Sequence, residues 1–224
     1  MDAGYFVTGT DTGIGKTLVA CALLHAYTRR GRRAVGMKPV AAGTSAAAGE
    51  WGNEDVAALA AAGNVAVEPA WMSPYRLALP VAPHIAARDA GVEIDFAAIE
   101  TSFARLRAAA DVVVVEGVGG FRVPLAARTD AADLAVRLGL PLVLVVGLRL
   151  GCLNHALLTA EAIAARGLRL AGWVANRIDP QMAKAAANVA ALRERIAAPL
   201  LAEVPFAERP DAAAVAALID VTRL

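Results

Sequence analysis

The sequence predicts an α/β fold with a mostly parallel central sheet and helices on both faces, and three observations support this. Short apolar runs rich in valine and leucine alternate with longer alanine-rich segments of helical period, as in repeated strand–helix units. These runs are too uniformly apolar for a sheet with one solvated face, so both faces are expected to be buried. A glycine-rich loop links the first run to the first helical segment. The length of 224 residues suggests one domain, residues 1–224.

The strands are expected at the apolar runs, and the helices at the alanine-rich segments between them. The predicted strands are Tyr5–Thr8, Ala34–Lys38, Asp111–Glu116, Leu142–Val146, Leu170–Asn176 and Leu200–Val204. The predicted helices are Lys16–Arg30, Asn53–Ala62, Val81–Ala90, Phe96–Ala109, Asp130–Leu138, Leu153–Arg166, Gln181–Ala197 and Ala212–Asp220. Gly31, Gly139 and Gly167 follow helical runs and precede strands, so they are predicted to end those helices.

Two segments show neither the helical nor the strand period of apolar residues. Gly43–Gly52 is rich in glycine, serine, threonine and alanine and is predicted to be a mobile loop. Pro69–Pro83 contains several prolines and is predicted to be irregular. It also offers polar and amphipathic side chains near a possible pocket, namely Trp71, Tyr75, Arg76 and His84.

Composition excludes several classes of protein. A hydrophobic content of 58% rules out disorder, and 22 Lys and Arg against 21 Asp and Glu give no basic footprint for nucleic acid. Cys21 and Cys152 are too few for a disulfide framework, which suits a reducing cytosol. The longest apolar run, Leu138–Leu148, is broken by Pro141 and is shorter than the roughly 18 residues of a membrane helix. A cytoplasmic protein that spans no membrane is therefore expected.

The strongest signal is the loop Gly9-Thr-Asp-Thr-Gly-Ile-Gly-Lys-Thr17, which follows a predicted strand and opens a predicted helix. Such a loop turns backbone N–H groups toward phosphate oxygens, while its lysine reaches the outer phosphates and its threonine can bind Mg²⁺. Five residues separate the outer glycines, one more than usual, so the loop is a variant. A P-loop NTPase-like fold follows, with a nucleoside triphosphate, which the family resemblance below implies is ATP, bound by Gly13, Ile14, Gly15, Lys16, Thr17 and Leu18.

Two carboxylates are candidate Mg²⁺ ligands. Glu116 ends a buried strand at the edge of the sheet where ligands of open α/β folds bind, and Gly117–Gly120 after it can form a glycine-lined wall. Mg²⁺ in such sites takes one or two carboxylates besides phosphate oxygens, and Asp55 suits the second position. Helix capping together with Asn53 explains Asp55 equally well.

Lysine is rare in this chain, and its positions are informative. Only three of the 22 cationic side chains are lysine, and Lys16 and Lys38 both fall at the predicted ligand-binding edge. A compact ammonium group fits between a phosphate and a second anion where a guanidinium does not. Lys38 can also be a strand-end lysine that extends to solvent. Lys184 is interpreted as a solvated helix charge.

The segment Asn176-Arg-Ile-Asp179 follows the fifth predicted strand and is a candidate for base recognition. It is similar to the guanine-reading Asn-Lys-x-Asp of GTPases, with arginine in place of lysine. A strand-end asparagine is often a turn former, and a four-residue match with one substitution is weak. Base recognition is retained for Asn176 but not for Asp179.

Several motifs together resemble the dethiobiotin synthetases. They are Gly-Thr-Asp-Thr-x-x-Gly-Lys-Thr at 9–17, Lys-Pro-Val-x-x-Gly at 38–43, Val-Glu-Gly-x-Gly-Gly at 115–120, Gly-Cys-Leu-Asn-His at 151–155, Ala-Gly-Trp-Val-Ala-Asn at 171–176 and Ala-Pro-Leu-Leu-Ala-Glu-Val-Pro at 198–205. The resemblance spans nearly the whole chain. It implies a homodimeric, Mg²⁺-dependent enzyme of biotin biosynthesis that closes a ureido ring on 7,8-diaminopelargonic acid with CO₂ and ATP.

The resemblance also implies roles for individual residues. Lys38 and Lys16 would be catalytic, Lys38 holding carbamate and γ-phosphate together, while Thr17, Asp55 and Glu116 hold Mg²⁺. The remaining ATP contacts would be Gly117, Val118, Gly119, Asn176, Arg177, Pro205, Phe206 and Asp211. The diamine would meet Thr12, Lys38, Ala42 and Gly119, and its carboxylate the helix start at Gly151, Cys152, Leu153 and Asn154, from the partner subunit.

One departure and two alternatives remain. Ala42 stands where family members often carry serine, so a hydroxyl contact to substrate is lost unless Thr44 or water supplies it. A partitioning or regulatory ATPase is the second hypothesis, against which Asp11 argues, because that group uses a lysine at this position. A GTP-binding switch, based on Asn176–Asp179, is the third.

Overall fold

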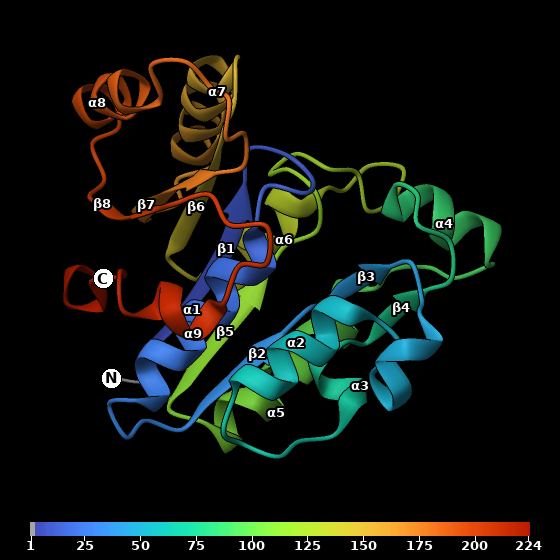
Figure 1. Ribbon diagram of the computed structural model, residues 1–224. Coiled ribbons are helices and arrows are strands. Elements are labelled where there is room, and N and C mark those ends of the chain that lie inside the picture. Colours follow the sequence, from blue (N-terminus) through green and yellow to red (C-terminus); the bar gives the residue numbers. More distant parts are fainter. Residues whose placement is uncertain (1–2) are drawn as a thin grey trace.

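The structure, a computed structural model that describes residues 3–224, has a six-stranded, wholly parallel central sheet (Figure 1). All six predicted strands are present with bounds shifted by a few residues. Their order is β2-β5-β1-β6-β7-β8, which places β1 between β5 and β6. The bounds are β1 Ala3–Gly9, β2 Ala34–Met37, β5 Val112–Glu116, β6 Leu142–Leu148, β7 Leu170–Arg177 and β8 Leu200–Val204. Because all strands run the same way, their carboxyl ends form one edge.

Helices cover both faces of this sheet, as right-handed crossovers between parallel strands require. On one face α1 (Lys16–Thr28) packs against α2 (Glu54–Ala62) and α9 (Ala212–Ala216). The opposite face carries α5 (Phe96–Ala109), α6 (Ala131–Leu138), α7 (Cys152–Ala165) and α8 (Ala185–Arg195). The predicted fold class is confirmed.

Most helices differ from their predicted bounds by one or two residues, and the differences at α8, α4 and α9 have a clear physical cause. Helix α8 was expected from Gln181, but Lys184 has a left-handed backbone with φ of 57°, so the helix begins after it. Helix α4 spans Pro83–Asp89 and not Val81–Ala90, because proline favours the first helical position. Helix α9 ends before the predicted Asp220, whose side chain instead caps a short 3₁₀ turn, η2, at Val221–Arg223.

The two segments without period contain structure that the sequence did not indicate. Strand β3 (Val40–Ala42) pairs in parallel with β4 (Tyr75–Leu77) in a small second sheet, preceded by the short helix α3 (Pro69–Met72). Gly43–Gly52, expected to be a loop, includes a kinked 3₁₀ helix η1 at Ala46–Trp51. Elements of three to six residues are too short to show a period, which explains why they were missed.

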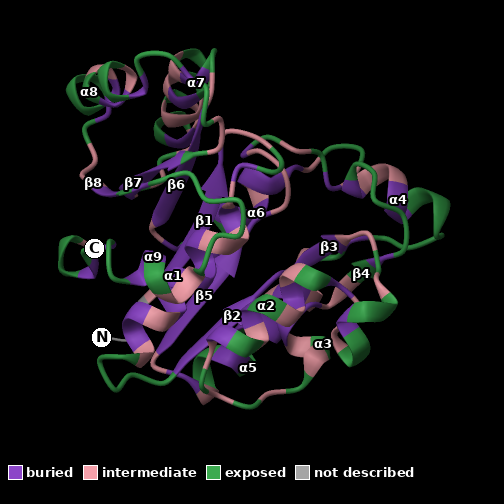
Figure 2. Cartoon of the chain, in the orientation of Figure 1, coloured by how far each residue is buried: buried purple, intermediate pink, exposed green. Residues whose placement is uncertain are grey.

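Burial follows the layers of the fold. The central strands are buried along their whole length, while the helices show buried inner faces and exposed outer faces (Figure 2). A second apolar cluster lies between β6, β7, α7 and α8 around the fully buried Trp173. Cys21 and Cys152 are both buried and free, as expected. Within residues 3–224, no helix is long and apolar enough to cross a bilayer.

Candidate active site

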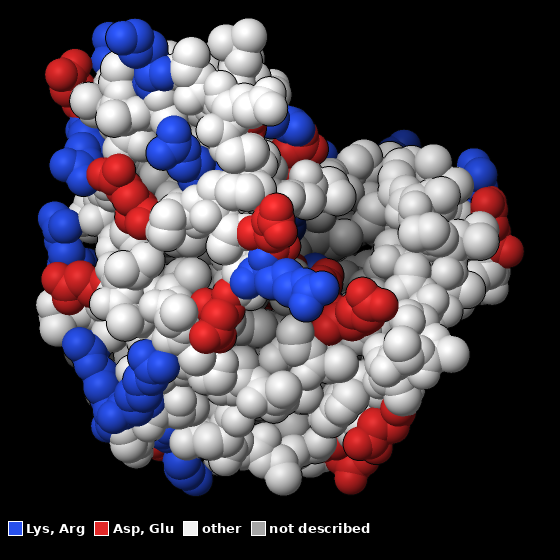
Figure 3. All heavy atoms as spheres, viewed as in Figure 1, with Lys and Arg blue, Asp and Glu red and all other residues white. Residues whose placement is uncertain are grey.

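A pocket of about 750 Å³ lies at the carboxyl ends of β1, β2 and β5. The space-filling view shows the molecule hollowed between the region of β3, β4 and α4 and the main body, with acidic and basic side chains interspersed around it (Figure 3). The pocket is lined by Thr12, Gly13, Gly15, Lys16, Thr17, Lys38, Ala42, Asp55, Pro80, Val81, Ala82, Pro83, Glu116, Val118, Gly119 and Val123. The candidate phosphate, metal and diamine residues therefore meet in one place.

The glycine-rich loop between β1 and α1 has the backbone that its sequence requires. Gly13 and Gly15 have φ of 72° and 93°, where side chains with a Cβ are strained. A Cβ on Gly15 would also lie 2.2 Å from the amide nitrogen of Asn176. That amide donates a hydrogen bond of 2.8 Å to the carbonyl of Ile14. The buried Asn176 thus ties the end of β7 to the loop.

Lys16 lies at the floor of the pocket and is buried. Its ammonium donates a 2.7 Å hydrogen bond to the backbone carbonyl of Asp11. Burial, reinforced by the neighbouring charge of Lys38, lowers the pKa of Lys16 to about 8. A cation that is so poorly compensated is well suited to receive an anionic ligand.

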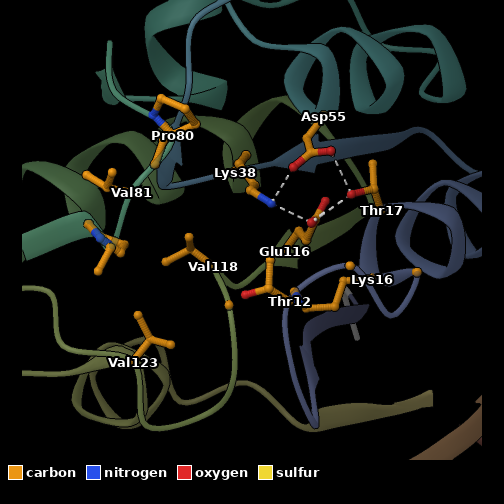
Figure 4. Close-up of a pocket in the computed structure, with 16 residues that line it drawn as sticks. Thr12, Lys16, Thr17, Lys38, Asp55, Pro80, Val81, Glu116, Val118 and Val123 are labelled. Carbon is orange, nitrogen blue, oxygen red and sulfur yellow. Dashed lines mark hydrogen bonds and ion pairs between the residues drawn. The ribbon is translucent and has the colours of Figure 1, made fainter. Parts of the chain in front are cut away.

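Lys38, at the end of β2, has the opposite surroundings (Figure 4). Its ammonium lies 2.8 Å from Asp55 Oδ2 and 2.5 Å from Glu116 Oε1. Burial lowers the pKa of Lys38, but the carboxylates of Glu116 and Asp55 outweigh it and the net pKa is raised. The pKa of Asp55 is lowered despite partial burial, chiefly by Lys38, whereas full burial raises the pKa of Glu116. The cluster is an ion triad in which Lys38 and Glu116 are buried and Asp55 is partly exposed.

The oxygens around Thr17 fit a magnesium ion. Thr17 Oγ1 lies 2.9 Å from both Asp55 Oδ1 and Glu116 Oε1, although one hydroxyl proton can satisfy only one of them. Glu116 Oε2 is buried without a partner among the described residues. Within the described chain no three His, Cys, Asp or Glu side chains form a metal cage. Two carboxylates and a hydroxyl, completed by phosphate oxygens and water, are the donor set that Mg²⁺ favours.

The side of the pocket away from these charges is apolar. Pro80, Val81, Val118 and Val123 lie on that side, as Figure 4 shows. The sequence indicated a pocket near Pro69–Pro83, but the described lining includes none of Trp71, Tyr75, Arg76 and His84. Trp71 instead lies under Arg105, Tyr75 bonds to the backbone of Asp95, and Arg76 bonds to the backbone carbonyl of Glu50. Val118 was predicted. The lining residues that the sequence did not single out have no polar side-chain group, so no chemical signal marked them; they are Pro80, Val81, Ala82, Pro83 and Val123.

The helix start at Gly151–Asn154 does not line the pocket of its own chain. No side chain of the described residues caps α7 there. The N–H of Cys152 donates to the carbonyl of Arg149, and the N–H groups of Leu153 and Asn154, for which the described residues provide no partner, are available to an anion. The preceding Leu150 is 94% exposed. Arg149 forms an ion pair with Asp11 and so links this loop to the glycine-rich loop.

The candidate adenine residues are dispersed. Arg177 and Pro205 line a separate pocket of about 200 Å³ beside α8, and Phe206 is exposed. Asp211 caps α9 through the N–H of Ala213. Asp179, for which base recognition was not retained, accepts a hydrogen bond from the N–H of Gln181 and so stabilises a turn.

Comparisons with known proteins identify close relatives. A family model described as an AAA domain matches residues 3–214. An ATP-dependent dethiobiotin synthetase of Aromatoleum aromaticum is 64% identical over 213 residues, which are 95% of each chain. A protein of the same name from Nitrosospira multiformis is 53% identical over 100% of this chain and 97% of its own. A protein of the same name from Ralstonia nicotianae is 58% identical over 98% of this chain and 96% of its own.

Solved structures show the same fold at low sequence identity. The MinC:MinD cell division complex of Aquifex aeolicus has a TM-score of 0.57 at 13% identity, covering 92% of this chain and 82% of that one. A ParA family ATPase from Chlorobium tepidum has a TM-score of 0.56 at 12% identity, covering 93% and 86%. At these identities the similarity establishes the fold of P-loop NTPases and nothing finer.

Proposed function

The chain belongs to the family of ATP-dependent dethiobiotin synthetases, ligases that form a carbon–nitrogen bond, and from that premise we propose its reaction and the residues that perform it. The reaction is closure of the ureido ring on 7,8-diaminopelargonic acid with CO₂ and ATP, which yields dethiobiotin, ADP and phosphate. The observation that carries the proposal is a single pocket with an ionic floor, at Lys16, Lys38, Asp55 and Glu116, and an apolar side.

The two halves of the pocket match the two halves of the substrate. A diamine that becomes an anionic carbamate needs a cation beside it, which Lys38 supplies, and the pocket lining also offers the hydroxyl of Thr12 as a hydrogen-bond donor. The alkyl chain of the substrate needs a surface without polar groups, and Val81, Val118 and Val123 supply it. Ala42 also lines the pocket, so the position without a hydroxyl faces the substrate.

Phosphate binding is assigned to the loop and to the triad. Loop N–H groups and Lys16 would hold the β- and γ-phosphates, for which Lys16 must leave the carbonyl of Asp11. Thr17, Asp55 and Glu116 would hold Mg²⁺, which, when bound, neutralises phosphate charge. The carboxylates would then share their charge between two cations, leaving the Lys38 ammonium free to contact substrate.

The chemistry requires no nucleophile from the protein. One amine of the substrate bonds to the carbon of CO₂ and releases a proton, giving a carbamate. A carbamate oxygen then attacks the γ-phosphorus and the bond to ADP breaks. The second amine attacks the carbamate carbon and releases a proton, the bond from that carbon to the phosphate oxygen breaks, phosphate leaves, and the ring closes. Lys38 would stabilise the negative charge that moves from carbamate to phosphate.

A homodimer would complete the site. The first turn of α7, at Gly151–Asn154, is uncapped and lies outside the pocket of its own chain, so it is free to hold the substrate carboxylate in the pocket of a partner. Leu150 and Leu158, which flank that turn, are 94% and 56% exposed, and burial against a second copy would remove this apolar surface from water. The proposed location is the cytoplasm, where free thiols such as Cys21 and Cys152 persist.

The adenine is assigned to the carboxyl ends of β7 and β8. Asn176 already contacts the phosphate loop through the carbonyl of Ile14, so a base next to Asn176 would lie beside the loop that holds the phosphates. Arg177, Pro205, Phe206 and Asp211 follow the same strand ends and are proposed to surround the base.

The test is to mix the protein with 7,8-diaminopelargonic acid, bicarbonate, Mg²⁺ and ATP and to follow the substrate mass and ADP together. Gain of one carbonyl with loss of two hydrogens, matched one to one with ADP, supports the proposal. ADP formation with unchanged diamine contradicts it and favours the ATPase hypothesis. Strict preference for GTP in the same assay would favour the GTP-switch hypothesis.

A further inference from the structure

We propose that Asn53 is a positioning residue that fixes the Asp55 carboxylate beside the phosphate loop, an inference that rests on the proposed role of Asp55 toward Mg²⁺. Asn53 is the residue before α2 and is buried, with 7% of its surface exposed. The sequence suggested only a helix cap at this position. The structure shows that its side chain also contacts an element outside the helix.

The side-chain amide of Asn53 uses both ends. Its oxygen accepts hydrogen bonds from the N–H groups of Asp55 at 3.0 Å and Val56 at 3.3 Å, which is ordinary capping of α2. Its nitrogen donates a 2.7 Å hydrogen bond to the carbonyl of Gly43, just after β3. Capping needs only the oxygen, which serine also supplies. The bond to Gly43 needs the nitrogen, which serine lacks.

Asp55 depends on its backbone for its direction. The Asp55 side chain is 41% exposed, so packing does little to orient it. Its two oxygens instead contact Thr17 of α1 at 2.9 Å and Lys38 after β2 at 2.8 Å. These contacts require the first turn of α2 to lie at one position relative to α1 and β2. Asn53 fixes that position, because it caps α2 and also bonds to Gly43.

The Gly43 end of the bond is equally fixed. Gly43 has φ of 89°, and its N–H donates to the carbonyl of Leu77 in β4 at 2.9 Å. A Cβ at Gly43 would lie 3.2 Å from Pro80, so the backbone there packs closely on the apolar side of the pocket. The neighbouring Ala42 lines the pocket. Asn53 therefore joins the acidic side of the pocket to its apolar side through one buried amide.

The test compares Asn53→Ser with the wild-type protein, using a fluorescent ATP analogue followed by anisotropy. Titration with Mg²⁺ gives the concentration at which the metal half-maximally strengthens nucleotide binding, and a sample with chelator gives binding without metal. Asn53→Ser keeps a capping oxygen but loses the donor to Gly43. We expect the Mg²⁺ requirement to rise roughly tenfold, the lower limit for residues that orient metal ligands. Metal-free nucleotide affinity should not change.

Two further variants separate the explanations. Asp95→Ala removes the side chain that caps α5 and does not line the pocket. This control should lower the urea midpoint without altering the Mg²⁺ requirement. Asp55→Asn removes the proposed ligand itself. If Asp55→Asn raises the Mg²⁺ requirement and Asn53→Ser does not, the positioning role is overturned and the metal site stands. If neither variant raises it, both are overturned.

Discussion

Lys16 and Lys38 are buried in the same pocket, but the two regions that contain them differ in the partners that they provide for the ammonium charge. The phosphate-loop region gives Lys16 one backbone carbonyl, and burial lowers the pKa of Lys16 to about 8. The strand-end region gives Lys38 two carboxylates, and the net pKa of Lys38 is raised. Burial of a charge is costly unless it is paired, so the first region is preorganised for an anionic ligand, whereas in the second the charges of Lys38 and the carboxylates compensate one another.

The largest expected effect comes from Lys38→Met, which keeps the length of the side chain and removes its charge. Asp55 and Glu116 would then face each other without a cation, so the free energy of unfolding should fall by about 3–5 kcal/mol in urea titrations at neutral pH. Nucleotide binding should be retained while ring closure is lost. The stability loss should shrink toward acid pH, where Glu116 gains a proton. A loss that does not depend on pH would argue against repulsion between the carboxylates.

The matched variant Lys16→Met should act in the opposite direction on stability. It removes a charge whose burial is poorly compensated and keeps the packing of its stem, so the free energy of unfolding should rise, by about 1 kcal/mol. Nucleotide affinity and turnover should both fall, because the contact to the outer phosphates is lost. If both methionine variants destabilise the protein equally, the contrast between the two regions fails.

The pH dependence of stability sharpens the same contrast. The pKa of Lys16 is lowered from 10.5 to about 8, so between these pH values the unfolded chain holds a proton at Lys16 that the folded chain lacks. Stability of the ligand-free protein should therefore gain a contribution that rises from pH 8 to 10.5. Lys16→Met should lack this contribution. The difference between the wild-type and variant urea midpoints, measured at intervals across this range, should be largest near pH 8 and shrink as the pH rises to 10.5; a constant difference would contradict the lowered pKa of Lys16.

The smallest effect is expected at the remaining lysine. Lys184 is exposed and sits before α8 with φ of 57°, the one described residue other than glycine with a positive φ. Asparagine tolerates this conformation better, so Lys184→Asn should raise the free energy of unfolding by about 0.5–1 kcal/mol and leave turnover unchanged. A drop in thermal midpoint would show that the lysine side chain contributes more than its backbone strain costs.

The sequence predicted the parts of the fold and site that depend on long periodic segments and on charged groups. The alternation of apolar runs predicted all six strands of the sheet, and the scarcity of lysine drew attention to Lys16 and Lys38. It did not predict β3 and β4, because three residues show no period. Nor did it predict the bond from Asn53 to Gly43, because two segments ten residues apart meet there only after both sheets have formed.

The same bond bears on how much the segment between its ends can vary. The backbone N–H of Ser45 donates to the carbonyl of Gly52 at 2.9 Å, and the amide of Asn53 reaches Gly43 at 2.7 Å, so the chain leaves and returns at nearly the same point. Lengthening a closed excursion costs only about 0.6 kcal/mol per doubling of its length. Ala46 and Ala47 are exposed, so an inserted peptide tag or fluorophore between them should leave the active site in position.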